Sequence, residues 1–302
     1  MAAFETVQQT VVFGNLMRLR LRPYNHGLSR AALFWYLAGM ITNWIKSILG
    51  SSKSQQPKFV VKSVEPTDQE KQIAITRLDE MARLAVFGQI GGVRPQKDNR
   101  TKSWWGGNFV GVQGEEIPAC NKSGRHMHPV LQIRVDELPE IPSAFEGLAL
   151  INIWMDLQAT TFWGAKNGDG FQVRAYADIE ELVPLGFGFN ESTELPTFPV
   201  LWKTKALEQP SWEDMAGEVP PNVARAMDSS WFFESNHAAN VDKFRDGNPI
   251  KLGGWPAWIQ GSDWPKDAEY FFQVDSNDKG KLYLGDAGSF YIFRTLEGWE
   301  IR

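Results

Sequence analysis

Two short stretches of the chain decide its fold: residues 130–136 read VLQIRVD, and residues 271–275 read FFQVD. Each places one glutamine, Gln132 or Gln273, among aliphatic, β-branched or aromatic residues. Such short runs, bounded by turn residues, are typical of strands. The two stretches therefore predict two similar strands, 141 residues apart.

The likeness continues on both sides of these strands. Gly147 and Gly288 each follow the glutamine by 15 residues, and each precedes a second predicted strand, LALINIW or SFYIFR. Upstream, residues 104–107 read WWGG and residues 251–254 read KLGG. A Gly-Gly bend, a strand with a glutamine, a turn and a second strand thus occur twice in one order. This pattern predicts an internal repeat.

A helix is predicted ahead of the first repeat. Thr67 and Glu70 form a capping box, in which each side chain bonds the backbone N–H of the other residue. Apolar residues then recur at helical spacing until Gly88, which predicts an amphipathic helix over residues 68–87. The sequence therefore predicts an α+β fold: mostly antiparallel sheets from two related β-units, with an N-terminal amphipathic helix.

The domain boundaries follow from these elements. Residues 65–302 form the predicted domain, with the repeat at about residues 103–156 and 250–302. Residues 51–64 are rich in Ser, Lys and Gln, which is typical of a linker. Residues 1–50 are left as an N-terminal extension.

Three interpretations of the extension stay open. Its most apolar stretch, residues 31–45, is shorter than the about 20 residues that a membrane-spanning helix needs. In one interpretation residues 16–50 form a peripheral amphipathic helix, and only then do we expect membrane contact. In another, Met40 is the natural start and residues 1–39 are upstream sequence included by a mis-assigned start. In the third, the segment is an ordinary packed helix.

Charge is unevenly distributed along the chain. The net charge is −5, from 31 Lys and Arg against 36 Asp and Glu, although residues 1–62 hold eight of the bases and a single acid, Glu5. The acidic body repels phosphate backbones, so we expect no nucleic-acid partner and favour a basic protein partner. One cysteine, Cys120, excludes an internal disulfide, and we predict a cytoplasmic protein.

No motif indicates catalysis or metal binding. Cys120, His126 and His128 are residue types that bind metals, but no second Cys/His pair follows them and Arg125 opposes a cation. The chain has no nucleophile elbow and no phosphate-binding glycine loop. We therefore predict no metal, no cofactor and no catalytic residue.

The body of the chain resembles the YwqG-like family, a bacterial family of unknown function. The resemblance is strongest in four C-terminal segments: residues 251–256 (KLGGWP), Gln260, residues 272–275 (FQVD) and residues 285–288 (GDAG). The first copy matches more loosely, because Asn108 and Phe109 stand where the family usually has a proline. The resemblance covers about residues 65–302. It implies a single α+β domain with no known reaction, and an immunity or accessory role, because members often lie beside toxin genes.

Two sets of candidate residues follow from the repeat and the resemblance. Those of the bends and turns are Gly106, Gly107, Gly253, Gly254, Pro256, Gly285 and Gly288. Those of a binding site are Gln132, Gln273, Trp255, Gln260, Asp275 and Asp286. The two glutamines either brace the backbone of neighbouring segments or line a cleft shared by the two copies. Residues 285–288 are predicted to form a hairpin turn.

Binding without turnover is the function that these patterns favour. The chain has 13 Trp, which can anchor a partner, and an acidic body, which attracts a basic one. We predict a non-catalytic, stoichiometric protein-binding protein, and the resemblance implies that it neutralises a cognate bacterial toxin. Two alternatives stay open: an enzyme of unknown reaction with a cleft between the repeats, and a small-molecule or peptide sensor.

Overall fold

The computed structural model describes the chain from Glu65 to Arg302 with gaps. Outside the described residues lie residues 1–64, 95–98, 160–161, 186–194, 212–213, 215–220, 228, 235–247, 260 and 286–287. The predicted extension and linker fall outside them, and so do two candidate binding residues, Gln260 and Asp286.

Strands make up most of the described regular structure. The helices of this part of the chain are α3 (Asp68–Glu80), α5 (Pro221–Met227) and α6 (Ser230–Glu234), with 3-10 turns at Val135–Glu137 and Ser143–Phe145. Its strands are β1 (Arg83–Ile90), β2 (Trp104–Trp105), β3 (Val110–Val112), β4 (His128–Arg134), β5 (Leu150–Met155), β6 (Phe171–Tyr176), β7 (Leu182–Pro184), β8 (Phe198–Glu208), β9 (Ile250–Gly253), β10 (Glu269–Asp275), β11 (Ser289–Thr295) and β12 (Gly298–Ile301).

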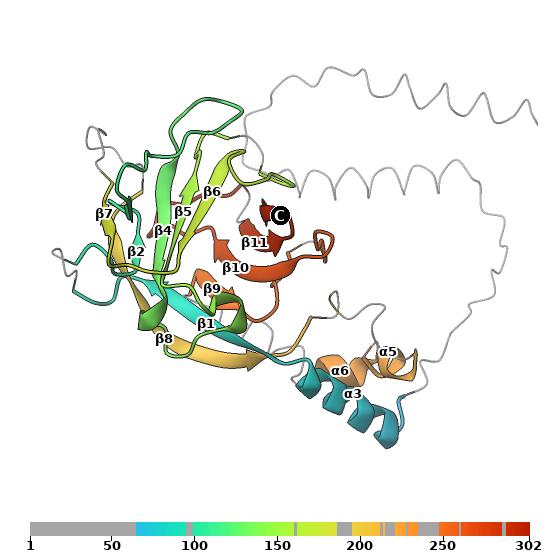
Figure 1. Cartoon of the computed structure of the whole chain (residues 1–302). Coiled ribbons are helices and arrows are strands. Elements are labelled where there is room, and N and C mark those ends of the chain that lie inside the picture. Colours follow the sequence, from blue (N-terminus) through green and yellow to red (C-terminus); the bar gives the residue numbers. More distant parts are fainter. Residues whose placement is uncertain are drawn as a thin grey trace, which may run out of the picture. The chain divides into compact units, whose positions relative to one another are not determined.

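Within the described residues, ten of these strands form one sheet in the order β12-β11-β10-β9-β1-β8-β2-β4-β5-β6, and β3 pairs with β7 separately. The long antiparallel pair of β1 and β8 lies at the centre. On one side of this pair follow β9, β10 and β11, and on the other β2, β4 and β5, each antiparallel to its neighbour (Figure 1). The predicted mostly antiparallel sheet is thus confirmed.

The sheet curls until its two ends meet. The connection between β5 and β6 bonds the last strand, β12: Gly164 N–H donates to Ile301 O (3.0 Å), Ile301 N–H to Ala165 O (3.1 Å) and Asn167 N–H to Trp299 O (3.0 Å). An open sheet edge exposes unpaired backbone groups, and these bonds cover the β12 edge. We call this contact between the β5–β6 connection and β12 the seam.

The main core lies inside the curl. It draws buried apolar side chains from all ten strands of the sheet. Phe145, from the turn before β5, stacks on Phe271 of β10 with ring centroids 4.1 Å apart. The two halves of the sheet, on either side of the β1–β8 pair, therefore pack on each other through one shared core.

The predicted helix over residues 68–87 is too long. The capping box is present, with Glu70 N–H donating to Thr67 Oγ1 and Thr67 N–H to Glu70, but the helix ends at Glu80. The following segment is strand β1, paired on both edges with β8 and β9. Its buried Val86 and Phe87 fit helical spacing equally well. Pairing with two distant strands decided the outcome, because a short apolar run suits a buried strand or a helix.

The three helices pack together at one end of the central strands (Figure 1). Ala74 and Leu78 of α3 are buried against Val223 and Met227 of α5. None of the helices that the structure describes is both long enough and apolar enough to cross a membrane.

Two further features concern the segments that join the strands. The stretch between the two predicted copies of the repeat, residues 157–249, supplies the central strand β8. The connection from β10 to β11 runs from Ser276 to Gly288 and contains an inner bridge between Asn277 and Leu282. Residues 285–288, predicted to form a hairpin turn, lie at the end of this connection, and residues 286–287 fall outside the described residues.

Candidate functional site

The two Gly-Gly pairs form the same kind of bend. Gly106 and Gly253 have φ of +59° and +64°, and the glycine after each is also in the left-handed region. A Cβ atom would lie 2.7 Å from Pro196 O at the first bend and 2.7 Å from Leu84 O at the second. Only glycine fits both the backbone angle and this close approach.

The third residue after the first bend, Val110, is clamped by two buried amides. Its N–H donates to Gln132 Oε1 (3.1 Å), and its carbonyl accepts from Asn152 Nδ2 (2.6 Å). The Gln132 amide nitrogen also donates to Arg100 O (2.8 Å) and Lys102 O (2.7 Å). Gln132 is fully buried, so its amide is used entirely on backbone groups.

The third residue after the second bend, Ala257, is clamped in the same way. Its N–H donates to Gln273 Oε1 (3.0 Å), and its carbonyl accepts from the Tyr291 hydroxyl (2.8 Å). The Gln273 amide nitrogen instead donates to Asp275 Oδ1 (2.7 Å), which also accepts from the Ser289 hydroxyl. Both predicted glutamines therefore brace backbone, and neither lines the cavities described below.

The residues opposite the two glutamines differ. Trp104 of β2 is the cross-strand partner of Gln132, whereas Lys251 of β9 is the cross-strand partner of Gln273. The Lys251 ammonium is buried and bonds both oxygens of the Glu208 carboxylate (3.0 and 3.1 Å), and it also donates to the Trp255 carbonyl. A buried ion pair with these additional bonds is a structural feature, because losing either partner would leave the other charge buried without a counter-ion.

Trp255, a candidate binding residue, is part of this structural feature. Its backbone N–H donates to Glu208 Oε2 (2.8 Å), and its indole nitrogen donates to Met81 O (3.0 Å). The Arg83 guanidinium lies 3.6 Å from its ring centroid. Trp255 and the buried Pro256 thus join the second bend to the start of β1.

A cavity of about 610 Å³ opens beside the seam, and we call it the seam cavity. Its lining residues are Trp163, Trp258, Ile259, Gly261, Ser262, Asp263, Leu284, Gly288, Ser289, Tyr291 and Arg302. Trp163, from the β5–β6 connection, is 73% exposed, and its indole nitrogen donates to Asp263 Oδ2 (2.7 Å). Arg302 forms an ion pair with Asp263 (3.2 Å) and another with Glu300.

The candidate binding residues lie around this cavity unevenly. Gly288, a candidate of the turns, lines it, and the candidate binding residues Gln273 and Asp275 lie behind its lining residues Ser289 and Tyr291. Sequence reasoning missed Trp163, whose signal is a large apolar side chain beside the turn-rich stretch GAKNGDG.

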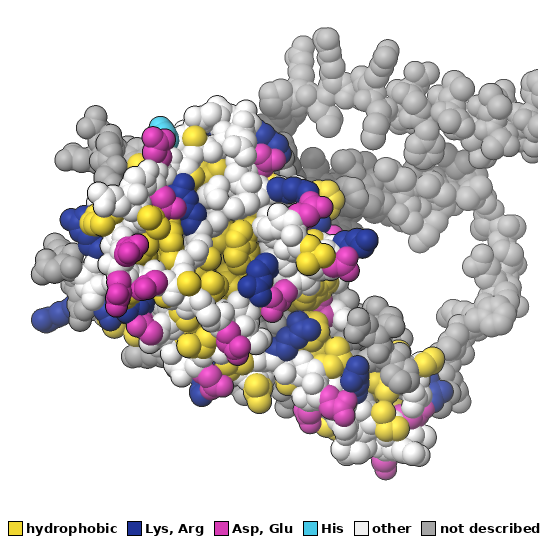
Figure 2. Space-filling view, viewed as in Figure 1, with side chains coloured by type: hydrophobic (Ala, Val, Ile, Leu, Met, Phe, Trp, Pro, Cys, Tyr) yellow, Lys and Arg dark blue, Asp and Glu magenta, His cyan; other side chains and the backbone are white. Residues whose placement is uncertain are grey.

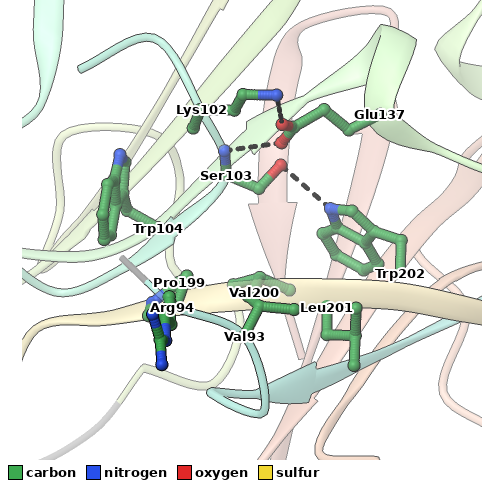
Figure 3. Close-up of a pocket in the computed structure, with 10 residues that line it drawn as sticks. All are labelled: Val93, Arg94, Lys102, Ser103, Trp104, Glu137, Pro199, Val200, Leu201 and Trp202. Atoms are coloured by element: carbon green, nitrogen blue, oxygen red, sulfur yellow. Dashed lines mark hydrogen bonds and ion pairs between the residues drawn. The ribbon is translucent and has the colours of Figure 1, made fainter. Parts of the chain in front are cut away.

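A smaller cavity of about 260 Å³ lies between two indole rings, and we call it the indole slot (Figure 3). Its lining residues are Val93, Arg94, Lys102, Ser103, Trp104, Glu137, Pro199, Val200, Leu201 and Trp202. Figure 3 shows Trp104 and Trp202 on opposite sides, with Lys102, Ser103 and Glu137 along one rim. The slot thus combines aromatic walls with a polar rim.

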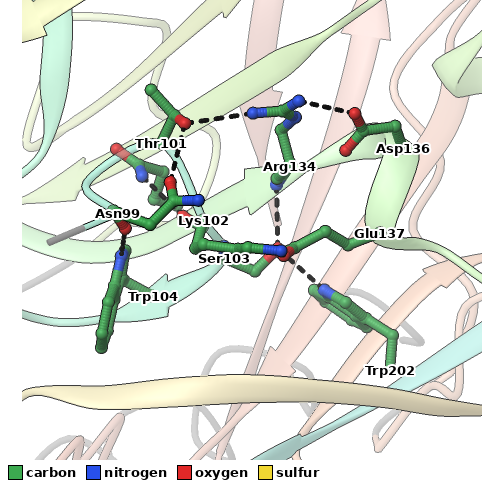
Figure 4. A network of polar contacts seen from close by, with 10 residues as sticks. Asn99, Thr101, Lys102, Ser103, Trp104, Arg134, Asp136, Glu137 and Trp202 are labelled. Atoms are coloured by element: carbon green, nitrogen blue, oxygen red, sulfur yellow. Dashed lines mark hydrogen bonds and ion pairs between the residues drawn. The ribbon is translucent and has the colours of Figure 1, made fainter. Parts of the chain in front are cut away.

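A polar network fixes that rim (Figure 4). Lys102 is 2.6 Å from Glu137 Oε1, and the Ser103 N–H donates to Glu137 Oε2 (2.8 Å). Ser103 Oγ accepts from Trp202 Nε1 (2.9 Å) and from the Arg134 N–H (2.9 Å). Because the Gln132 amide also bonds Lys102 O, the first clamp supports the rim of the slot.

Near Cys120, where the sequence has residue types that bind metals, the structure contains an ion-pair cluster. Arg125 bonds both carboxylate oxygens of the buried Asp156 (3.1 and 2.8 Å), and Ser123 donates to it as well (2.8 Å). Burial alone would raise the pKa of Asp156, but these bonds hold the pKa below its ordinary value. Within the described residues, no group of three or more His, Cys, Asp or Glu side chains is placed to hold a metal ion.

In the part of the chain that the structure describes, fold and sites together define a curled, largely antiparallel sheet protein with two clamped bends, a seam cavity and an indole slot. The chain belongs to the family described as Domain of unknown function (DUF1963), whose model matches residues 103–297. The matched segment contains both bends, both clamps and most residues of both cavities. A comparison with curated proteins finds no match.

Proposed function

We propose that this protein acts by stoichiometric, non-catalytic binding of a basic protein partner, and that the seam cavity receives a cationic side chain of that partner. The observation that carries the proposal is Trp163. Its indole ring is 73% exposed, yet it is held at the edge of the cavity by the bond to Asp263. A large ring held in place in water is the kind of residue that anchors a protein interface.

The chemistry of the seam cavity suits a cation. Trp163, Trp258 and Tyr291 supply aromatic rings, whose faces attract ammonium and guanidinium groups. Among the described residues here, the cation Arg302 is paired with two carboxylates, Asp263 of the lining and Glu300 beside it, so these three side chains together carry one negative charge. The chain's net charge of −5 adds a long-range attraction for a basic partner.

The more specific parts of the proposal rest on the resemblance to the YwqG-like family. The protein would be a YwqG-like immunity or accessory protein of the bacterial cytoplasm that neutralises a cognate toxin by occupying it. We also propose that residues 103–156 and 250–302 are copies of one ancestral unit. The matching bends support this, as do the clamps on Val110 and Ala257, each the third residue after its bend.

Peptide display on the purified full chain tests the binding mode. We expect selected peptides to be rich in Lys and Arg, to bind one to one in calorimetry and to be recovered uncleaved. Trp163→Ala and Asp263→Asn should each weaken binding by about tenfold or more, the equivalent of about 1.4 kcal/mol. Leu207→Ala, an equally exposed apolar residue on β8, is the matched control and should bind as the wild type does.

The salt dependence of binding and the stoichiometry of neutralisation also test the proposal. Association should slow as salt rises, because screening shortens the range of the attraction to about 8 Å at physiological salt. Selection of neutral or acidic peptides, or unchanged binding in Trp163→Ala, would contradict the proposal. In co-expression with a toxin that the protein neutralises, growth should be rescued only near one-to-one amounts. Rescue at strongly substoichiometric amounts would indicate turnover.

A further inference from the structure

The indole slot has the size and walls of a site for one flat ring. Its volume of about 260 Å³ lies just below the range of about 300–1,000 Å³ typical of drug-sized ligands. Trp104 and Trp202 use their indole N–H groups within the protein, on Asn99 O (3.3 Å) and Ser103 Oγ (2.9 Å). The two rings line the slot from opposite sides, where the surface that each turns to the slot is placed for apolar contact with a ligand (Figure 3).

The charge of the slot is opposite to that of the chain. Its lining contains two cations, Arg94 and Lys102, and one carboxylate, Glu137, which Lys102 already neutralises at 2.6 Å. Arg94 is exposed and makes no hydrogen bond or ion pair with any residue that the structure describes. In a protein of net charge −5, this cavity thus has a spare positive charge.

Ser103 adds a buried donor. Its side-chain oxygen accepts two hydrogen bonds, from Trp202 Nε1 and from the Arg134 N–H, and the residue is 1% exposed. Among the described residues nothing accepts its hydroxyl proton. Buried polar groups are normally paired, so a hydroxyl proton at a cavity wall favours a ligand that brings an acceptor.

We infer that the indole slot binds a small aromatic anion: one ring lies between Trp104 and Trp202, and its carboxylate accepts a hydrogen bond from the Ser103 hydroxyl and pairs with Arg94. This site is separate from the seam cavity and does not rest on the proposed protein partner. Cationic ligands are disfavoured by Arg94 and Lys102, and neutral isosteres lose the charge-assisted bond.

Calorimetry and ligand-observed NMR on the full chain with three matched probes test the inference. Phenylacetate, phenylacetamide and phenethylamine share a ring and differ in charge. We expect phenylacetate to bind with a Kd of about 1 mM or tighter, and the other two at least about tenfold more weakly. Trp163→Ala at the seam cavity should leave phenylacetate binding unchanged, which separates this site from the proposed function.

Variants of the slot complete the test. Arg94→Gln should weaken phenylacetate binding about tenfold and, because Arg94 is exposed, should fold normally. Ser103→Ala should also weaken it, although that variant also removes the acceptor for Trp202 and Arg134. Arg77→Gln, on α3, is the matched control. Equal binding of all three probes, no binding of phenylacetate, or binding unaffected by Arg94→Gln would each overturn the inference.

Discussion

The two clamped bends use one backbone arrangement with different side chains. In both, a buried glutamine bonds the N–H of the third residue after a Gly-Gly bend, and a side chain of the next strand bonds its carbonyl. That second side chain is Asn152 at the first bend and Tyr291 at the second. The residue opposite the glutamine is Trp104 in one and the buried cation Lys251 in the other.

The comparison separates two roles within each clamp. One hydrogen bond stabilises the fold, and the remaining amide hydrogens contact residues near a cavity. The bond to backbone is present in both clamps, as expected for a buried segment that must satisfy its polar groups. The remaining amide hydrogens diverge. Those of Gln132 support the loop that lines the indole slot, whereas Gln273 bonds Asp275, which reaches Ser289 of the seam cavity.

The ion pair found only at the second bend should give the largest effect. Lys251→Met leaves the buried Glu208 carboxylate without its counter-ion, so we expect a loss of about 3–5 kcal/mol in urea unfolding. Lys205→Met, on the same strand as Glu208 but exposed, should change stability by less than about 0.5 kcal/mol. A loss below about 1 kcal/mol in Lys251→Met would show that the two bends do not differ in this way.

Replacing each glutamine compares the clamps directly. Gln132→Leu orphans three backbone groups, and we expect a loss of about 3 kcal/mol or more, while Gln273→Leu should cost about 1–3 kcal/mol. The exposed Gln89→Leu on β1 is the control for a glutamine in a strand and should be near neutral. Equal losses, or a larger one for Gln273→Leu, measured by urea unfolding, would reverse this ranking.

A smaller, pH-dependent difference should appear at the ends of β5 and β11. There Asp156 and Thr295 each accept a bond from the backbone N–H two residues later, from Gln158 and Glu297. The pKa of Asp156 is lowered in the folded protein, so its contribution is present above the ordinary value of about 3.9 and is lost as pH falls through the folded pKa.

Urea unfolding across acidic pH measures this contribution. Wild-type stability should fall more steeply below about pH 4 than that of Asp156→Asn, which has no carboxylate to protonate. Thr295→Val should lower stability by the same amount at every pH, since the hydroxyl does not titrate. Parallel curves for the wild type and Asp156→Asn would show that the Asp156–Arg125 pair contributes nothing to acid sensitivity.

Prediction from the sequence succeeded where the signal was local. The strands β4 and β10, the start of α3 at its capping box and the two glycine bends lie within a few residues of their expected positions. The helix expected to reach residue 87 was wrong beyond Glu80, because the apolar spacing of β1 fits a helix until its strand partners are known. The exposed Trp163 was missed because the turn-rich stretch beside it, residues 164–170, does not by itself separate an exposed tryptophan from a core one.

By itself the sequence determined that two similar strands carry a buried glutamine and that each follows a bend only glycine can make. Backbone angles and side-chain period act over a few residues, so they can be read without partners. Only the tertiary structure decided that Lys251 meets Glu208, that β12 closes on the β5–β6 connection, and that two cavities open beside the clamps. Those contacts join segments far apart in the chain, and their choice depends on how the whole sheet buries one shared core.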